Sequence, residues 1–149
     1  MHNTGEGGLS RHHRHGADLT YQIGTAYFGC RDEHGRFDLQ RLKDLVAGAP
    51  VRALEIKLSQ GAKPGLGGVL PGAKVSAEIA ATRGVPEGVD CVSPSRHAEF
   101  DDPDSLLDWI ERRWDGLQAY ADSKLFDATL AAARARLAKD ASEALERDR

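Results

Sequence analysis

The sequence predicts an α/β fold built on a βαβ unit that ends in a glycine-rich loop. A β-prone run from Leu19 to Gly24 supplies the first strand, and the apolar run from Val51 to Leu58 supplies the second. Between them, Asp38 caps a helix and Gly48 ends it. This order favours two parallel strands, so the loop that follows lies at their carboxyl ends, where barrel enzymes place their chemistry.

Local patterns assign the segments around the first strand and helix. Met1 to Gly16 is polar and glycine-rich, which predicts a loop with no strand or helix before it. Tyr27 to Cys30 is a short apolar patch, and Asp32 to Gly35 is a turn. Apolar residues at helical spacing predict the buried face of the first helix: Leu39, Leu42, Leu45 and Val46.

After the glycine-rich loop, the pattern predicts a second helix and a short strand. The helix runs from Lys74 to Arg83, with Val75, Ile79 and Ala80 on its inner face. Pro86 and Gly88 follow, and the strand spans 89–92.

Two further helices are predicted in the rest of the chain. Asp102 and Pro103 begin the first, because Asp caps a helix and Pro suits its first turn. Its buried stripe comprises Leu106, Leu107 and Ile110. The second is a long amphipathic helix over 120–147, with Phe126, Leu130, Ala133 and Leu137 on its apolar face.

Composition excludes several classes of protein. The 149 residues suit one domain, and a net charge of -3 gives no global basic field for nucleic acid. No apolar run approaches the ~20 residues of a membrane span, and the polar, His-rich start is not a secretory signal. Cys30 and Cys91 lie far apart and form no metal-type spacing, which indicates a reduced, cytoplasmic compartment. His12, His13 and His15 have no acidic or cysteine partner arranged with them, so we assign no metal.

The glycine-rich loop has the composition of an anion site. Its glycines bare backbone N–H groups, and cations stand beside them, so a phosphate or carboxylate suits the loop. An ordinary surface loop explains the same composition equally well. The polar members of the loop are Lys57, Gln60, Lys63 and Lys74.

The sequences of three blocks resemble those of a known protein family. The blocks are Lys57-Leu-Ser-Gln-Gly-Ala-Lys-Pro-Gly-Leu-Gly-Gly-Val-Leu-Pro-Gly72, Asn3-Thr-Gly-Glu-Gly-Gly8 and Val92-Ser-Pro-Ser-Arg-His97. Together they resemble the flavin domain of glutamate synthases and of smaller glutamate-synthase-like FMN proteins, in the family's order. The resemblance covers about 2–111, and it implies part of a (β/α)8 barrel that carries FMN and reduces 2-oxoglutarate plus ammonia to glutamate.

The resemblance implies roles for individual residues. Glu6 and Lys57 take the catalytic positions, and Lys63 and Arg83 match positions that hold the 2-oxoglutarate carboxylates. Lys57 and Gln60 stand beside the flavin, and the backbone at Gly65, Gly67 and Gly68 approaches the cofactor. The structural alternatives are a solvated acid for Glu6, a solvated charge for Lys63 and a helix-terminal cation for Arg83.

The chain departs from the family pattern in two places. The family commonly has Glu at Leu66 and Gln at Val69, which weakens the assignment of 2-oxoglutarate rather than a similar dicarboxylate. The cysteine run of the family's iron–sulfur cluster is absent, so we expect no cluster in this chain.

The sequence after about Arg112 has a different character. Tyr120 and Lys124 stand one helical turn apart, and residues 115–138 weakly resemble the catalytic helix of short-chain dehydrogenases. No dinucleotide-binding glycine motif accompanies them, so a plain amphipathic helix is the favoured interpretation. We therefore divide the chain into a flavin-barrel fragment, 1–111, and a helical tail of different origin, 112–149.

These observations lead to one expectation with two alternatives. A complete barrel needs about 250 residues, so we expect a fragment with about three strands, little bound FMN, little activity alone, and self-association through exposed sheet edges. The alternatives are a non-enzymatic anion-binding or interaction module and a short-chain dehydrogenase remnant. A gene junction near Arg112 would account for the change in character.

Overall fold

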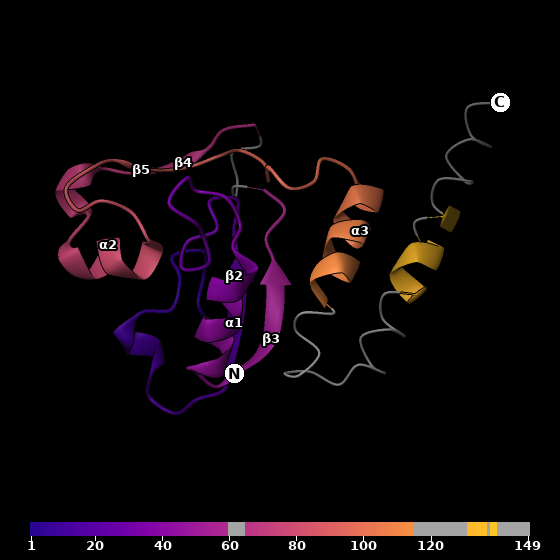
Figure 1. The fold of residues 1–149 in the computed structure, drawn as a ribbon, viewed down its shortest axis with the longest axis horizontal. Coiled ribbons are helices and arrows are strands. Elements are labelled where there is room, and N and C mark those ends of the chain that lie inside the picture. The colour runs from indigo at the N-terminus through magenta and orange to yellow at the C-terminus, as the bar shows by residue number, and fades with distance from the viewer. Residues whose placement is uncertain (60–64, 115–130, 137, 140–149) are drawn as a thin grey trace. The chain divides into compact units, whose positions relative to one another are not determined.

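The computed structural model describes residues 1–59, 65–114, 131–136 and 138–139. The chain divides into two compact units, Met1–Glu99 and Phe100–Arg149, which are described one at a time (Figure 1). The first unit holds a parallel sheet, a two-stranded antiparallel ribbon and two α-helices. The second holds a helix and a further helical stretch at 131–136 and 138–139.

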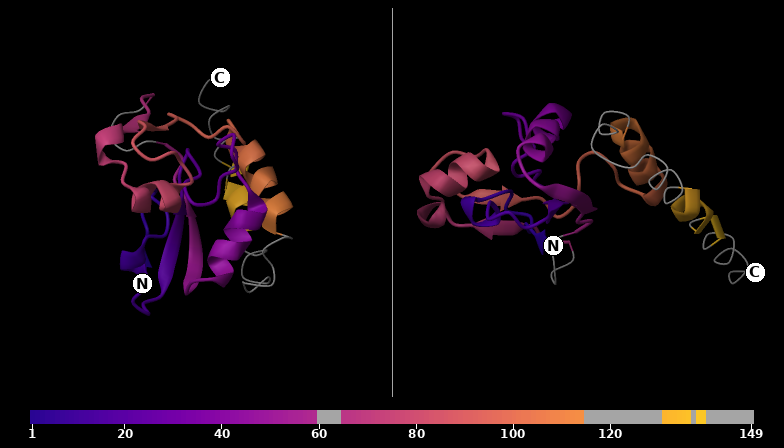
Figure 2. Two further views of the ribbon diagram at one scale, coloured as in Figure 1. Left: turned by 60° about the vertical axis from the view of Figure 1, so that its left-hand side comes forward. Right: turned by 90° about the horizontal axis from the view of Figure 1, so that it is seen from below.

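Three parallel strands form the sheet of the first unit. They are β1 (His2–Asn3), β2 (Leu19–Ile23) and β3 (Val51–Ile56), in the order β1-β2-β3. The α1 helix (Leu39–Ala47) connects β2 to β3 and lies on one face of the strands (Figure 2). The predicted βαβ unit is therefore confirmed.

The start of the chain differs from the expected loop. The backbone N–H of His2 donates to the Asp18 carbonyl, and that of Thr4 donates to the Thr20 carbonyl, so β1 pairs with β2. A strand of two residues carries no alternating pattern, which is why the sequence alone did not predict it. A 3-10 turn, η1 (Arg11–His13), follows in the same segment.

Capping explains the limits of α1. The Asp38 carboxylate accepts hydrogen bonds from the backbone N–H groups of Gln40 and Arg41, and the Gly48 N–H donates to the Asp44 carbonyl. Leu42 and Val46 are buried, and Leu39 and Leu45 are half-buried. The predicted ends and buried face of this helix are confirmed.

An antiparallel ribbon occupies part of the region predicted as loop. It pairs β4 (Gly68–Leu70) with β5 (Cys91–Ser93), so the expectation of continuous loop over 68–70 is wrong (Figure 1). Gly67 makes the pairing close, because a Cβ there would lie 2.2 Å from the Ser93 carbonyl oxygen. The predicted strand at 89–92 begins two residues later, at the first paired residue.

The helix after the loop is shorter than predicted. A 3-10 turn, η2 (Gly72–Lys74), comes first, and α2 (Ala77–Arg83) starts only after Ser76, whose hydroxyl caps it. Gly84 ends the helix in the left-handed region, with φ 69°.

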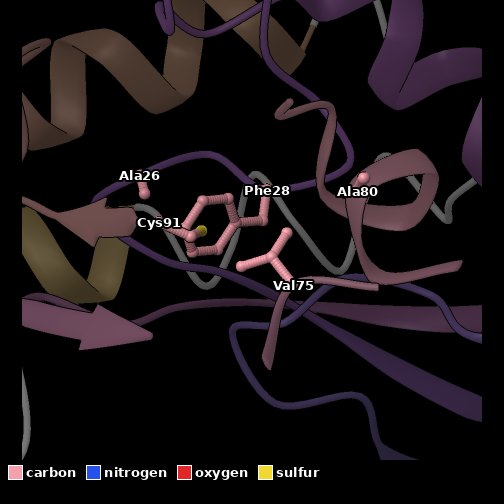
Figure 3. Packing of buried hydrophobic residues seen from close by; sticks show 5 residues of the cluster. All are labelled: Ala26, Phe28, Val75, Ala80 and Cys91. Atoms are coloured by element: carbon pink, nitrogen blue, oxygen red, sulfur yellow. The ribbon is translucent and has the colours of Figure 1, made fainter. Parts of the chain in front are cut away.

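Buried apolar side chains from the loop after β2 and from α2 pack together against the ribbon. Val75 and Ala80 lie inward as predicted, and the half-buried Ile79 packs against them. The cluster contains Ala26, Phe28, Val75, Ala80 and Cys91 (Figure 3). The Tyr21 hydroxyl donates a 2.6 Å hydrogen bond to the Phe28 carbonyl, which ties β2 to this cluster.

The second unit begins with α3 (Pro103–Trp114). The Asp102 carboxylate accepts from the Ser105 N–H at 2.8 Å, which confirms the predicted start. The predicted buried stripe needs a correction, because Leu107 and Trp109 are buried while Leu106 and Ile110 are half-buried. The Trp109 ring lies 5.6 Å from that of Phe100, a contact that helical spacing does not reveal.

Only part of the predicted long C-terminal helix lies among the described residues. Residues 131–136 and 138–139 are helical, and Arg134 pairs with Asp108 and Glu111 of α3. Of the predicted apolar face, only Ala133 lies among the described residues. The other members, Phe126, Leu130 and Leu137, lie outside them, as do Tyr120 and Lys124.

The described residues form a mixed α/β structure with an open parallel sheet. Within 1–59, 65–114, 131–136 and 138–139 the strands do not close into a barrel, so the expected barrel architecture is seen only as its βαβ unit. In the same ranges, no helix is long and apolar enough to cross a membrane.

Candidate functional site

Three strand ends meet at one edge of the parallel sheet. Glu6 follows β1, Gly24 follows β2 and Lys57 follows β3. Because the strands are parallel and adjacent, these positions share the carboxyl edge, where α/β enzymes gather their functional groups. There the Lys57 ammonium lies 2.7 Å from the Glu6 carboxylate. The two side chains are 29% and 25% exposed, so the pair is accessible but partly shielded from water.

Glu6 is held from two further sides. Ser93, at the end of β5, donates from its hydroxyl to the other Glu6 oxygen at 3.4 Å. A Cβ on Gly24 would lie 2.9 Å from the Glu6 Cβ, so the glycine makes room for the acid to approach β2. The carboxylate is therefore built into the edge of the sheet.

The backbone of Lys57 is fixed on both sides. Its N–H donates to the Ile23 carbonyl at 3.0 Å, which continues the pairing of β3 with β2. Its carbonyl accepts from Nε2 of His97 at 2.8 Å. Nδ1 of His97 lies 3.0 Å from the Tyr27 hydroxyl.

Burial controls the ionisation of these supporting residues. His97 is 4% exposed, and its desolvation lowers the pKa of the imidazole below its usual value. Burial also raises the pKa of Tyr27 to about 12. Both groups are therefore neutral at pH 7.

Arg83, the last residue of α2, lies beside the loop that carries Glu6. Its Nη2 would be 3.3 Å from a Cβ on Gly7, and its guanidinium carbon lies 4.8 Å from the centre of the Phe28 ring. Its Nη1 is 3.6 Å from the Cys91 sulfur. The helix end therefore places a cation next to the 5–8 loop, supported by an aromatic face.

The other predicted site residues divide into two groups. Gln60 and Lys63 lie outside the described residues. Gly65 has φ +80°, a conformation that favours glycine, and Gly67 lies against the Ser93 carbonyl oxygen. Gly68 begins β4. The geometry thus gives Gly65 and Gly67 a structural reason to be glycine, and their cofactor-binding roles remain predictions.

Comparison with known proteins identifies the family. A family model described as the conserved region in glutamate synthase matches residues 1–121. The chain belongs to the glutamate synthase family. A glutamate synthase large subunit-like protein, YerD, of Bacillus subtilis is 46% identical over 111 residues, which are 74% of this chain and 21% of that protein.

Other relatives match the same part of the chain. An archaeal glutamate synthase [NADPH] of Methanocaldococcus jannaschii is 46% identical over 98 residues, 65% of this chain and 17% of that protein. An archaeal-type glutamate synthase [NADPH] of Thermotoga maritima is 43% identical over 99 residues, 66% of this chain and 17% of that protein. The matched segment thus spans about a fifth of the length of these glutamate synthase relatives.

The family match extends further than the sequence resemblance suggested. It runs to residue 121, whereas the three motif blocks indicated a limit near residue 111. The matched region includes Tyr120 but not Lys124.

Three residues that support the Lys57–Glu6 pair were not assigned roles from the sequence. They are Ser93, His97 and Tyr27, which hold Glu6 or Lys57 or support a residue that does. Two of them stand in the block from Val92 to His97, so the block itself was the signal that could have found them. Tyr27 has φ 53°, which no sequence pattern indicated.

Metal binding has no support in the described part of the chain. There, no three His, Cys, Asp or Glu side chains are grouped so that they could hold an ion.

Proposed function

We propose that this chain supplies one side of a flavin-dependent glutamate synthase site, in which 2-oxoglutarate is reductively aminated to glutamate. The observation that carries the proposal is the Lys57–Glu6 pair at the carboxyl edge of the parallel sheet. A partly exposed ammonium beside a carboxylate, next to a guanidinium, is a donor set suited to a flavin ring and a dicarboxylate. When bound, FMN supplies the hydride for the reaction.

In this proposal, Lys57 places a positive charge beside the flavin ring, and Gln60 adds an amide close to it. Glu6 holds the ammonium in position through its 2.7 Å contact and can exchange a proton at its carboxylate. The Ser93 hydroxyl donates to one Glu6 oxygen and so restricts rotation of the carboxylate. Gly65, Gly67 and Gly68 let the backbone approach the cofactor without side chains in between.

Arg83 and Lys63 are proposed to hold the substrate carboxylates. The planar guanidinium of Arg83 pairs with a carboxylate through two parallel hydrogen bonds. Its stacking on Phe28 limits the motion of the group and aims it toward the 5–8 loop. Leu66 and Val69 are apolar at positions where the family commonly has polar side chains, and they are 60% and 63% exposed. Because these polar groups are missing, we assign the substrate class broadly, as 2-oxoglutarate or a similar dicarboxylate.

We further propose that this chain alone has little activity and binds FMN weakly. The described sheet has three parallel strands and two open edges, and late barrel loops often hold a cofactor phosphate. β3 is an outer strand of the described sheet, so a second copy can pair at this edge. Sedimentation at increasing protein concentration tests the self-association, and a monomer at every concentration contradicts it.

A flavin titration tests the proposed role of Lys57. The intact chain is titrated into FMN, and the change in flavin fluorescence is recorded. We expect weak binding that Lys57→Met reduces several-fold. The control is Lys43→Met, the same change on α1, which should bind like the parent chain. Equal binding by all three proteins removes Lys57 from the flavin site.

Activity is measured on the same preparations with an artificial electron donor. We expect little or no glutamate formation. One tightly bound FMN per chain together with turnover would contradict the proposed weakness of the isolated chain and leave the site assignment standing.

A further inference from the structure

His97 occupies a buried position between two backbone segments. It follows β5 by four residues and is 4% exposed. One ring nitrogen contacts the carbonyl of Lys57 at the end of β3, and the other contacts the hydroxyl of Tyr27 after β2. A single imidazole therefore links the loops that follow β2, β3 and β5.

The two partners determine which nitrogen carries the proton. A carbonyl oxygen only accepts, so Nε2 of His97 donates to Lys57. In the neutral ring Nδ1 is then an acceptor, so the Tyr27 hydroxyl donates to it.

Tyr27 adopts a strained backbone conformation, which indicates that its contact with His97 is not incidental packing. Its φ of 53° is in the left-handed region, where residues other than glycine are disfavoured. Its ring also packs edge-on against Phe37, with centroids 5.7 Å apart. The hydroxyl is thus held firmly while the backbone remains strained.

The Lys57 carbonyl is the point at which this link acts on the site. The Lys57 N–H is already paired with β2, so the hydrogen bond from His97 fixes the remaining polar group of that backbone. With both groups held, the side chain leaves the strand end in one direction, toward Glu6.

We propose that His97 is a positioning residue that acts through Lys57: its Nε2–H holds the Lys57 carbonyl so that the ammonium meets Glu6. The inference deepens the proposed function, because it concerns the same strand-end pair. None of its tests uses flavin or turnover, so its failure leaves the flavin proposal standing, and a failure to bind FMN leaves this link intact.

Two substitutions separate the two hydrogen bonds. In His97→Gln the side-chain amide can reach the Lys57 carbonyl as Nε2 does. In His97→Asn the shorter amide stays near Tyr27 and does not reach Lys57. His12→Asn, at an exposed position of η1, is the matched control.

The readout is the coupling between Glu6 and Lys57. Unfolding constants of Glu6→Gln, Lys57→Met and the double variant are combined in a cycle within each His97 background. We expect a coupling factor of about threefold to fivefold in the parent chain and in H97Q, and about onefold in H97N. The H12N background should keep the parent value. An unchanged coupling factor in a folded H97N variant overturns the proposal, because a merely structural histidine would alter stability and not the coupling.

A second measurement needs no variant and decides the matter if H97N does not fold. The 15N resonances of the His97 ring report which nitrogen is protonated in the intact chain. We expect the Nε2–H tautomer at pH 7. The Nδ1–H tautomer would leave the Lys57 carbonyl without this donor and would overturn the proposal.

Discussion

The Lys57 ammonium and the Glu6 carboxylate lie 2.7 Å apart, although 51 residues separate them in the chain. The contact exists because β1, β2 and β3 are parallel neighbours, so the loops after β1 and β3 end at the same edge. A substitution of Glu6 should therefore lower the stability of the folded chain as well as affect the proposed chemistry.

Replacing Glu6 by Gln should lower the free energy of unfolding by about 1 kcal/mol, because the partly shielded ammonium of Lys57 loses its partner. Urea denaturation measures the change. Glu33→Gln is the control, since that side chain is 84% exposed and should change stability by less than about 0.5 kcal/mol. Equal effects at the two positions would show that the Glu6 contact contributes nothing.

The position that matches Arg83 can be tested in a full-length, active relative. Arg→Leu there should raise the Michaelis constant for 2-oxoglutarate by roughly tenfold to a hundredfold, because one charge-assisted pair is lost. FMN bound per chain should not change and serves as the internal control. An unchanged Michaelis constant and turnover would remove Arg83 from the substrate role.

Stability should fall as the pH drops through the region near 6.5. Burial lowers the pKa of His97 below its ordinary 6.5, so the unfolded chain takes up a proton there while the folded chain does not. The stabilisation is complete above pH 6.5 and is lost as the pH approaches the lower folded pKa. The ring contacts the Tyr27 hydroxyl and the Lys57 carbonyl, and the negative charge of Glu99 opposes the lowering of the pKa without reversing it.

Urea midpoints between pH 7.5 and 5 measure this loss, and H97Q should flatten it. Asp32 and Asp102 do not confuse the result, because hydrogen bonds lower their pKa values below 3.8, outside this window. A slope that H97Q leaves unchanged would assign the pH dependence to another group.

Gly67→Ala should destabilise the chain by about 1–3 kcal/mol. The new Cβ would lie 2.2 Å from the Ser93 carbonyl oxygen, so β4 and β5 could not pair at their present distance. Thermal unfolding measures the effect. Gly48→Ala is the control, because φ is -88° there and the nearest atom to the new Cβ, the Asp44 carbonyl oxygen, would lie 3.3 Å away rather than 2.2 Å. A neutral Gly67→Ala would mean that the ribbon can shift without cost.

Both thiols should be protected from reagents in the folded chain. Burial raises the pKa of Cys30 to about 12, and Cys91 is 4% exposed. Labelling by a disulfide reagent should therefore be slow and should follow unfolding. In denaturant, both cysteines should react at once. Rapid labelling without denaturant would show that the core cluster opens readily.

Local signals were sufficient for the elements that depend on neighbouring residues. Asp38 and Gly48 set the ends of α1, and Asp102 set the start of α3, because caps act within one helical turn. The parallel pairing of β2 with β3 followed from the helix between them. The motif block of Lys57 to Gly72 indicated the glutamate synthase family, and the family match over residues 1–121 confirms it.

Contacts between distant segments required the tertiary structure. The β4–β5 ribbon joins residues 68–70 to 91–93. A strand of three residues is too short to show a periodic pattern, so the sequence does not predict which strand it pairs with. The burial of Trp109 depends on Phe100, and the role of His97 depends on Tyr27 and Lys57, which lie 70 and 40 residues away. The βαβ unit, the helix caps and the family could be predicted from residue patterns, because these features are encoded over short stretches. The contacts of Lys57 with Glu6 and His97 could be found only in the folded chain, because they depend on where the strand ends come together.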